Sequence, residues 1–209
     1  MSDDAGGGDR WGPSRPAPHR PAYAGVPDYL WTPAAAALLT LVCGLLGVAT
    51  NQLWLFPSLG PTAFLLAHSP EQPAARAWNV VVGHLLALAA GYAALALFGG
   101  LGAPDLFAAH ELAPVRVWAS ALAVALTLAA QLVTRSFHPP AAATTLLVAL
   151  GGFRPTPGDA GAVVGGVLIL AFAGGLLRRV HDELDLVERG GRAGDPPDDD
   201  PDDRADGPA

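Results

Sequence analysis

Residues 51–68 read NQLWLFPSLGPTAFLLAH, an apolar stretch that is interrupted in its middle by Pro57, Gly60 and Pro61. Proline removes a backbone donor and clashes with the preceding turn, so a continuous helix is not expected here. The stretch that can still be helical, residues 62–67, is too short to cross a bilayer. We therefore predict a half-helix or re-entrant segment that is buried against other helices.

A second broken stretch, SFHPPAAATTLLVAL, occupies residues 136–150, and its PPAAATTLLVA echoes the earlier GPTAFLLA. In each half of the chain a long apolar run, a broken stretch, a Pro-containing loop and a Gly-rich apolar run follow one another, which predicts an internal repeat. Paired interrupted segments at matching positions indicate a transport site near the middle of the membrane. The alternative, that Pro and Gly only kink ordinary helices, stays open.

Four long apolar runs flank these stretches and are about long enough to cross a bilayer as helices. Hydrophobic residues make up 51% of the chain and charged residues only 15%. We predict an all-α fold, a polytopic membrane helical bundle with four full spans and two Pro-broken half-helices. The expected spans are residues 33–50, 78–98, 115–135 and 161–177. Small residues at four-residue spacing, Gly83, Ala87 and Gly91 in one run and Gly161 with Gly165 in another, predict close helix contacts.

The two ends of the chain differ in composition from this core. Residues 1–28 are rich in Gly, Pro and Asp, and residues 181–209 are acidic, so disordered tails are expected on either side of a transmembrane domain at 29–180. The net charge of −7 argues against a nucleic-acid partner. The expected partner is the lipid bilayer. Four spans leave little material around a pore, which favours a homo-oligomer.

Arginines outside the core predict the orientation of a multi-pass protein in the cell membrane. Both termini are expected in the cytoplasm, which requires an even number of crossings. Four spans with two re-entrant segments satisfy this, and so do six crossings if each broken segment passes right through. Six crossings place Arg76 and Arg135 inside, whereas the short half-helices favour four, and both topologies stay open. The arginines that set the orientation are Arg10, Arg15, Arg20, Arg178 and Arg179.

His138, Pro139 and Pro140 form the first group of candidate functional residues. The proline pair stops a helix, and a half-helix that starts after it would present unpaired N–H groups and a positive dipole end, which favour anions. His138 can change charge near neutral pH, and Thr144 follows in the same half-helix. The group is interpreted as part of an anion site or a proton relay. The simpler interpretation is that His138 ends the preceding span by bonding a backbone carbonyl.

Polar residues recur at helical spacing through the third span and predict one polar stripe, which would face protein or water rather than lipid. Arg135 lies at the end of this stripe, where it would either balance an anion or extend to the interface. The stripe consists of Ser120, Thr127, Gln131, Thr134 and His138.

Two further groups come from the first half of the chain. Ser58 or Thr62 could cap the first half-helix and so mirror the N–H groups after Pro140. Asn79 and His84 lie in the second span, where a histidine is a candidate functional residue or a packed, satisfied one.

Enzyme signatures are missing from the membrane stretches, which contain no paired carboxylates, H-E-x-x-H, nucleophile elbow or P-loop. The histidines also lack the regular spacing of metal ligands. The protein is therefore expected not to be an enzyme and to need no metal or cofactor.

The segments LFPSLGPTAFLLAHSPEQPAARAWNVVVGH and HPPAAATTLL, in this order, make the chain similar to the HPP family of integral membrane proteins over roughly residues 30–180. The resemblance implies a family described as four-span proteins, with plant plastid members and cyanobacterial relatives linked to nitrite transport. The matching motif residues are Pro57, Gly60, Pro61, Thr62, Pro70, Pro73, Asn79, Gly83, His84, His138, Pro139, Pro140 and Ala141.

The leading hypothesis is a transporter or channel for a small inorganic anion, with nitrite as the candidate that the resemblance names. The anion would lie between the two half-helix N-termini. The alternative is a non-transporting scaffold or partner-binding module, in which the polar stripe is a helix interface. The predicted substrate-binding residues are His138, Thr62, Ser58, His84, Asn79, Thr144 and Gln131.

Overall fold

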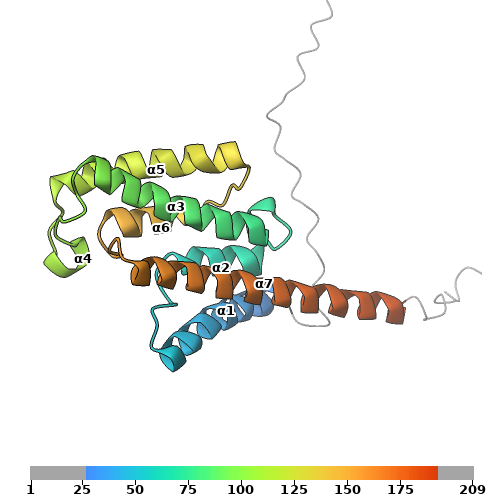
Figure 1. Ribbon diagram of the computed structural model, residues 1–209. Helices are drawn as coiled ribbons and strands as arrows, with labels where there is room; N and C mark the ends of the chain where they lie inside the picture. The colour runs from blue at the N-terminus through green and yellow to red at the C-terminus, as the bar shows by residue number, and fades with distance from the viewer. Residues whose placement is uncertain (1–26, 193–209) are drawn as a thin grey trace, which may run out of the picture.

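The computed structural model describes residues 27–192, which fold into helices without any strand (Figure 1). Four of these helices are long and apolar enough to span a membrane: α1, α3, α5 and α7. The predicted polytopic helical bundle with two half-helices is therefore confirmed. The elements are α1 (Asp28–Thr50), α2 (Leu59–His68), the 3-10 turn η1 (Pro73–Ala75), α3 (Ala77–Leu97), α4 (Leu106–Ala109), α5 (Pro114–Thr134), α6 (Ala141–Ala149) and α7 (Pro157–Arg192).

Several helix boundaries differ from the prediction, most of all at the start of the first helix and the end of the last. The first helix starts at Asp28, so that Pro33 lies inside it rather than at its first position. The last helix continues to Arg192, so the first part of the segment expected to be a disordered tail is helical. Its sequence, HDELDLVER, consists largely of good helix formers, which allow a helix to extend beyond its apolar part. The rest of both expected tails, 1–26 and 193–209, lies outside the described residues.

The predicted internal repeat is present, and its two halves run in opposite directions. Helices α1, α2 and α3 have the same order of long, short and long elements as α5, α6 and α7. In Figure 1, α1 and α3 run from right to left, whereas α5 and α7 run from left to right. The two half-helices likewise point in opposite directions. The fold is thus an inverted repeat, an arrangement common among transporters.

Each broken segment passes from one end of the bundle to the other. Arg116, near the start of α5, donates to the carbonyl of Ala149 at the end of α6. The chain leaves α5 at its opposite end, so residues 135–149 run the length of the bundle (Figure 1). At that opposite end, Arg178 of α7 donates to the carbonyl of Pro70, just after α2.

Of the two topologies left open by the sequence, the structure therefore has the one in which the broken segments pass right through. A short helix suffices because the non-helical chain before it covers the remaining distance. Residues 51–58 can span roughly 3.3 Å each when extended, against 1.5 Å in a helix.

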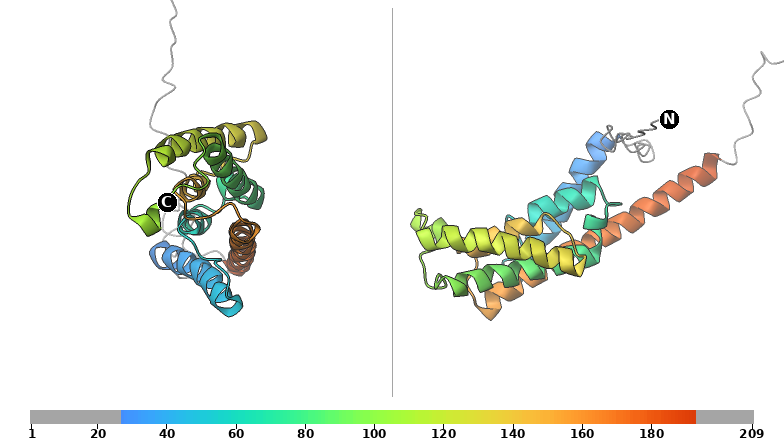
Figure 2. Two further views of the ribbon diagram at one scale, coloured as in Figure 1. Left: turned by 60° about the vertical axis from the view of Figure 1, so that its left-hand side comes forward. Right: turned by 90° about the horizontal axis from the view of Figure 1, so that it is seen from above.

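Helix α3 packs on α5, α6 and α7. In the left-hand view of Figure 2, the half-helices α2 and α6 lie between the long helices. Its predicted small-residue face is confirmed, because a Cβ atom at Gly83 would lie 2.8 Å from His138 Cβ and one at Gly91 would lie 2.7 Å from Val148. The prediction for α7 is wrong in part. Gly165 accommodates the Trp54 ring of the broken segment rather than a helix, and no atom lies within 4 Å of a Cβ built at Gly161.

Candidate functional site

The N-termini of the two half-helices meet inside the bundle. Ser58 is the N-cap residue of α2, and its hydroxyl accepts a hydrogen bond of 2.8 Å from Thr144 Oγ1 in the first turns of α6. Thr62 Oγ1, in α2, lies 3.1 Å from Nε2 of His138, which immediately precedes α6. These contacts join segments that are 86 and 76 residues apart in the sequence.

The first backbone N–H groups of the half-helices are not open to a ligand in this conformation. Those of Leu59 and Gly60 donate to the carbonyls of Phe56 and Pro57. The N–H groups of residues 141–143 donate in the same way to residues 138–140. The expectation of unpaired N–H groups is therefore wrong here, because each half-helix begins with a 3-10-like turn.

Ser58 occupies the predicted N-cap position, but its side chain makes no capping hydrogen bond. The preceding carbonyls already serve the first N–H groups of α2, which leaves the Ser58 hydroxyl to bind across the bundle to Thr144. A side chain that would ordinarily stabilise its own helix thus joins the two halves of the repeat.

The ring of His84, from α3, lies between the two half-helices. Its Nε2 atom is 3.0 Å from Thr62 Oγ1, and its Nδ1 atom is 2.6 Å from Thr144 Oγ1. The ring centroids of His84 and His138 are 5.1 Å apart. We refer to Ser58, Thr62, His84, His138 and Thr144 as the polar cluster.

His138 is held from three directions. Its Nδ1 atom donates to the carbonyl of Ala74 in η1 at 2.8 Å. Its backbone N–H donates to Gln131 Oε1 at 3.0 Å, and Gln131 Nε2 donates to the carbonyls of Gly83 and His138 at 3.4 Å. Gln131 thus positions the histidine rather than belonging to the polar cluster. The bond to Ala74 is to a carbonyl of η1, not to one of the preceding span.

The predicted polar stripe of α5 faces the bundle interior over part of its length. Thr127 is buried and lies 2.8 Å from Thr145 of α6, hydroxyl to hydroxyl. Helix α5 ends at Thr134, which is exposed, and Arg135 then turns the chain with a left-handed φ of 53°. Because Arg135 is exposed, it does not contact the polar cluster.

Asn79 lies beside the polar cluster. Its Nδ2 atom donates to the carbonyls of Pro73 at 2.8 Å and Phe137 at 3.4 Å. It thereby connects η1 to the segment that carries His138. Among the predicted site residues, the side chains of Asn79 and Gln131 bond only to backbone groups, whereas those of the other five bond to one another.

The polar cluster is enclosed and contains no carboxylate, lysine or arginine. All five of its side chains are 1% exposed or less. No group of three potential metal-ligating side chains occurs among residues 27–192. The space next to His84, which Val163 and Val167 of α7 also line, is about 10 Å³, at the lower limit for one water molecule.

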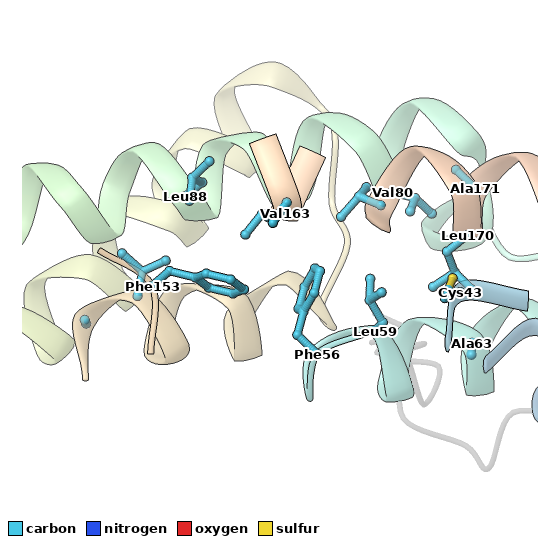
Figure 3. Close-up of a cluster of buried hydrophobic side chains, with 14 of the residues drawn as sticks. Cys43, Phe56, Leu59, Ala63, Val80, Leu88, Phe153, Val163, Leu170 and Ala171 are labelled. Carbon is cyan, nitrogen blue, oxygen red and sulfur yellow. The ribbon is translucent and has the colours of Figure 1, made fainter. Parts of the chain in front are cut away.

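A larger pocket of about 570 Å³ opens at the end of the bundle where α1 and α6 end. We call it the vestibule; Gln52, Asp105, Arg154 and Asp159 are among its lining residues. One of its lining residues, the buried Phe153, packs edge to face on Phe56 with ring centroids 5.3 Å apart (Figure 3). Phe56 precedes Ser58 by two residues.

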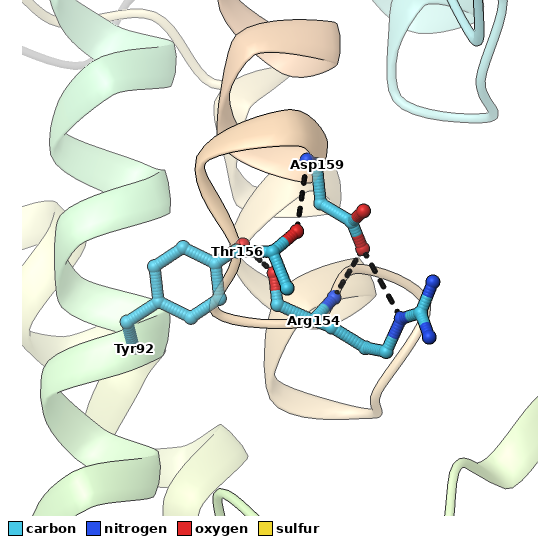
Figure 4. Close-up of polar contacts among 4 residues, drawn as sticks. All are labelled: Tyr92, Arg154, Thr156 and Asp159. Atoms are coloured by element: carbon cyan, nitrogen blue, oxygen red, sulfur yellow. Dashed lines mark hydrogen bonds and ion pairs between the residues drawn. The ribbon is translucent and has the colours of Figure 1, made fainter.

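The vestibule rim is ordered by polar contacts in the loop before α7 (Figure 4). Asp159 accepts from the backbone N–H of Arg154 at 2.7 Å and forms an ion pair with its side chain at 3.7 Å. Tyr92 of α3 donates to the carbonyl of Arg154 at 2.7 Å. The bond from Tyr92 attaches this loop to α3.

Arg116 is a buried residue for which the sequence suggested no role. Its guanidinium donates to the carbonyls of Ala103, Pro104 and Ala149 at 2.7, 2.6 and 2.9 Å. It therefore stabilises the C-terminal end of α6, where the helix dipole favours a cation. An arginine at the start of an apolar run resembles an ordinary interfacial charge, and only its place inside an otherwise uncharged run could have drawn attention to it.

Residues 21–183 of the chain match the model of one protein family, which is described as "HPP, transmembrane region". No curated protein and no solved structure matches the chain.

Proposed function

The chain belongs to the HPP family of membrane proteins, and from this premise we propose that it transports a small inorganic anion, with nitrite as the first candidate. The proposed site is the polar cluster. The protein acts as a carrier or channel in the cell membrane and not as an enzyme, and both of its termini lie in the cytoplasm.

The observation that carries the proposal is the meeting of two half-helix N-termini at a buried set of hydroxyl and imidazole groups. A helix N-terminus carries a partial positive charge, and two of them directed at one point favour an anion there. The cluster contains no carboxylate that would repel it. Hydroxyl and imidazole groups can donate to nitrite oxygens as readily as to one another.

The proposal requires the cluster to open, because its groups now bind one another and leave no space for an anion. The vestibule offers an approach from one end, and Phe153, which lines it, packs on Phe56, two residues before Ser58. We assign this pair the role of a gate. Rotation of either ring would connect the vestibule to Ser58.

Anion flux into proteoliposomes tests the proposal. Nitrite, nitrate, formate and chloride are supplied at mildly alkaline pH, so that nitrous acid does not cross the bilayer unaided. Wild-type protein should carry at least one of the four, and His138→Ala should lose that flux. His68→Ala removes an exposed histidine outside the cluster and should behave as wild type. Flux no higher than in empty liposomes for all four anions would refute the proposal, and a stoichiometric copurifying partner would then favour the scaffold.

A further inference from the structure

The polar cluster forms one chain of hydrogen-bonding groups across the bundle, from which only a weaker contact of 3.4 Å, between Thr62 Oγ1 and the carbonyl of Ser58 in the same half-helix, branches off. Every link is 3.1 Å or shorter, and every side chain in it is buried. Because a hydroxyl has one proton and a neutral imidazole has one, the number of protons in the chain can be counted. In order, its members are Ser58, Thr144, His84, Thr62, His138 and the Ala74 carbonyl.

The count starts at His138. Its Nδ1 atom faces the Ala74 carbonyl, which can only accept, so Nδ1 carries a proton. In a neutral ring Nε2 is then an acceptor, and it needs the proton of Thr62, 3.1 Å away.

Counting protons from the other end shows that His84 also needs the proton of Thr62. Thr144 donates its only proton to Ser58, so His84 Nδ1 has to donate to Thr144. Its Nε2 atom is then an acceptor as well, 3.0 Å from the same Thr62 hydroxyl. As long as Thr144 donates to Ser58, two acceptor nitrogens face one hydroxyl proton, and one of these contacts lacks a proton while both rings are neutral.

A single added proton satisfies every link. If one Nε2 atom becomes protonated, it donates to Thr62, and Thr62 donates to the other ring. The neutral state can also be satisfied, but only after the Ser58 and Thr144 hydroxyls rotate so that Ser58 donates to Thr144 and Thr144 donates to His84. The two states of the chain thus differ by one proton and by the direction of the bonds that the Ser58 and Thr144 hydroxyls make.

We propose that the His84–Thr62–His138 group binds one proton, and that it takes this proton up together with the transported anion. The first half of the proposal rests on the hydrogen-bond geometry. The second half rests on the proposed function. The protein is accordingly a proton–anion symporter whose coupling site and anion site are the same cluster.

The surroundings of the two rings explain the coupling. Helix α2 presents Ser58 and Thr62, α5 presents Gln131, α6 presents Thr144, α7 presents valines and η1 presents a carbonyl. Apart from each other, no charged or titratable side chain of the described residues acts on either ring. The one buried arginine, Arg116, binds carbonyls at the far end of α6.

An added proton therefore creates a positive charge without a counter-ion in a dry environment, which is costly. An anion in the opened cluster removes this cost, and the proton in turn attracts the anion. By thermodynamic reciprocity, each ligand then strengthens the binding of the other.

The test separates coupling from transport. Proteoliposomes receive the anion that shows flux at equal pH, at the same concentration on both sides, and the outside is then acidified. One-to-one symport should accumulate the anion inside by about tenfold for a pH difference of about one unit. The plateau is measured rather than the rate, because a variant that is only slow still reaches the coupled plateau. Protein-free liposomes under the same gradient are the blank, because nitrous or formic acid that crosses the bilayer unaided would reach the same level, and only accumulation above that blank is counted.

Thr62→Val removes the shared hydroxyl and should abolish accumulation even where slow flux persists. Thr62→Ser keeps the hydroxyl and should restore the plateau. Thr145→Val removes an equally buried hydroxyl, bonded to Thr127 outside the chain of six groups, and should keep the plateau. Flux without pH-driven accumulation in the wild type overturns the coupling and leaves anion transport standing. Accumulation by Thr62→Val equal to wild type overturns the assignment to this cluster.

A second measurement decides the proton site if no flux is found. The ring nitrogens are followed by 15N NMR of histidine-labelled protein from about pH 8 to about pH 5, the range in which a histidine can change charge. His84→Gln and His138→Gln assign the two rings. One ring should gain a second proton, at a higher pH when nitrite is present. Two rings that stay neutral throughout overturn the proton site, and protonation that nitrite does not shift overturns the coupling.

Discussion

Thr62 and Thr144 occupy the same position in the two half-helices, four residues after the N-cap residues Ser58 and Pro140. Their hydroxyls contact the two nitrogens of one ring, that of His84, at 3.0 and 2.6 Å. The inverted repeat therefore supplies two matched hydroxyls to one central histidine. The result is a single site that both halves of the chain share.

Thr144→Val should destabilise the protein by about 1–3 kcal/mol, because His84 Nδ1 and Ser58 Oγ would both be buried without this partner. Thermal unfolding in detergent measures the change. Thr50→Val, which removes an exposed hydroxyl at the end of α1, is the control and should have little effect. Equal unfolding temperatures for the two variants would contradict the importance of the polar cluster for stability.

Gly83→Ala should be destabilising although alanine favours helices. The new Cβ would lie 2.8 Å from His138 Cβ, which Gln131 and Ala74 hold in place, and such overpacking costs about 1–3 kcal/mol. Gly161→Ala adds the same atom to α7 with no neighbour within 4 Å and should be neutral or stabilising by up to about 1 kcal/mol. The unfolding temperatures of the two variants should therefore change in opposite directions, or only that of Gly83→Ala should change.

Arg116→Met should cost about 3 kcal/mol, because three carbonyls lose their donor, at about 1 kcal/mol for each hydrogen bond. Arg116→Lys keeps the positive charge, but the compact ammonium group cannot donate to all three carbonyls as the planar guanidinium does. An intermediate loss of stability is therefore expected. Thermal unfolding again provides the measurement. Arg76, which is exposed, provides the control. If Arg76→Met lowers the unfolding temperature as much as Arg116→Met, Arg116 has no special role in stability.

The proposed gate predicts a change in accessibility. The chain has one cysteine, Cys43, and replacing it by alanine leaves Ser58→Cys as the only thiol. A polar thiol reagent should react slowly at this buried position, and Phe153→Ala should accelerate the reaction by about tenfold, which corresponds to about 1.4 kcal/mol in the barrier.

Phe172→Ala truncates a phenylalanine that is exposed on the outside of α7 and provides the matched control for this experiment. The labelling rate at residue 58 should stay unchanged in that variant. If Phe153→Ala also leaves the rate unchanged, the ring pair does not separate the vestibule from the polar cluster.

The breaks in the two half-helices follow from the sequence because their cause is local. Proline at positions 57, 61, 139 and 140 prevents a continuous helix whatever surrounds it. The four spans follow from hydropathy in the same way. The ends of helices were less accurate, since α7 continues past its apolar part to Arg192.

The candidate residues could also be selected from the sequence, because hydroxyl, amide and imidazole groups inside apolar runs are conspicuous. Their partners could not. The predicted cap at Ser58 is a bond across the bundle, and the N–H groups expected to be free are satisfied by a tight turn. Arg116 went unassigned because its three carbonyl acceptors come from the loop before α5 and from α6.

By itself, the sequence determined a membrane-embedded helical bundle with two interrupted segments and a repeat, since these depend on composition and on the backbone properties of proline. Only the tertiary structure decided that the two halves run in opposite directions and that the interrupted segments pass right through. It also decided that Thr62, Thr144 and His84 meet. The physical reason is that these hydrogen bonds join residues 22 and 60 positions apart in the sequence. They depend on how the helices pack, which no local sequence pattern determines.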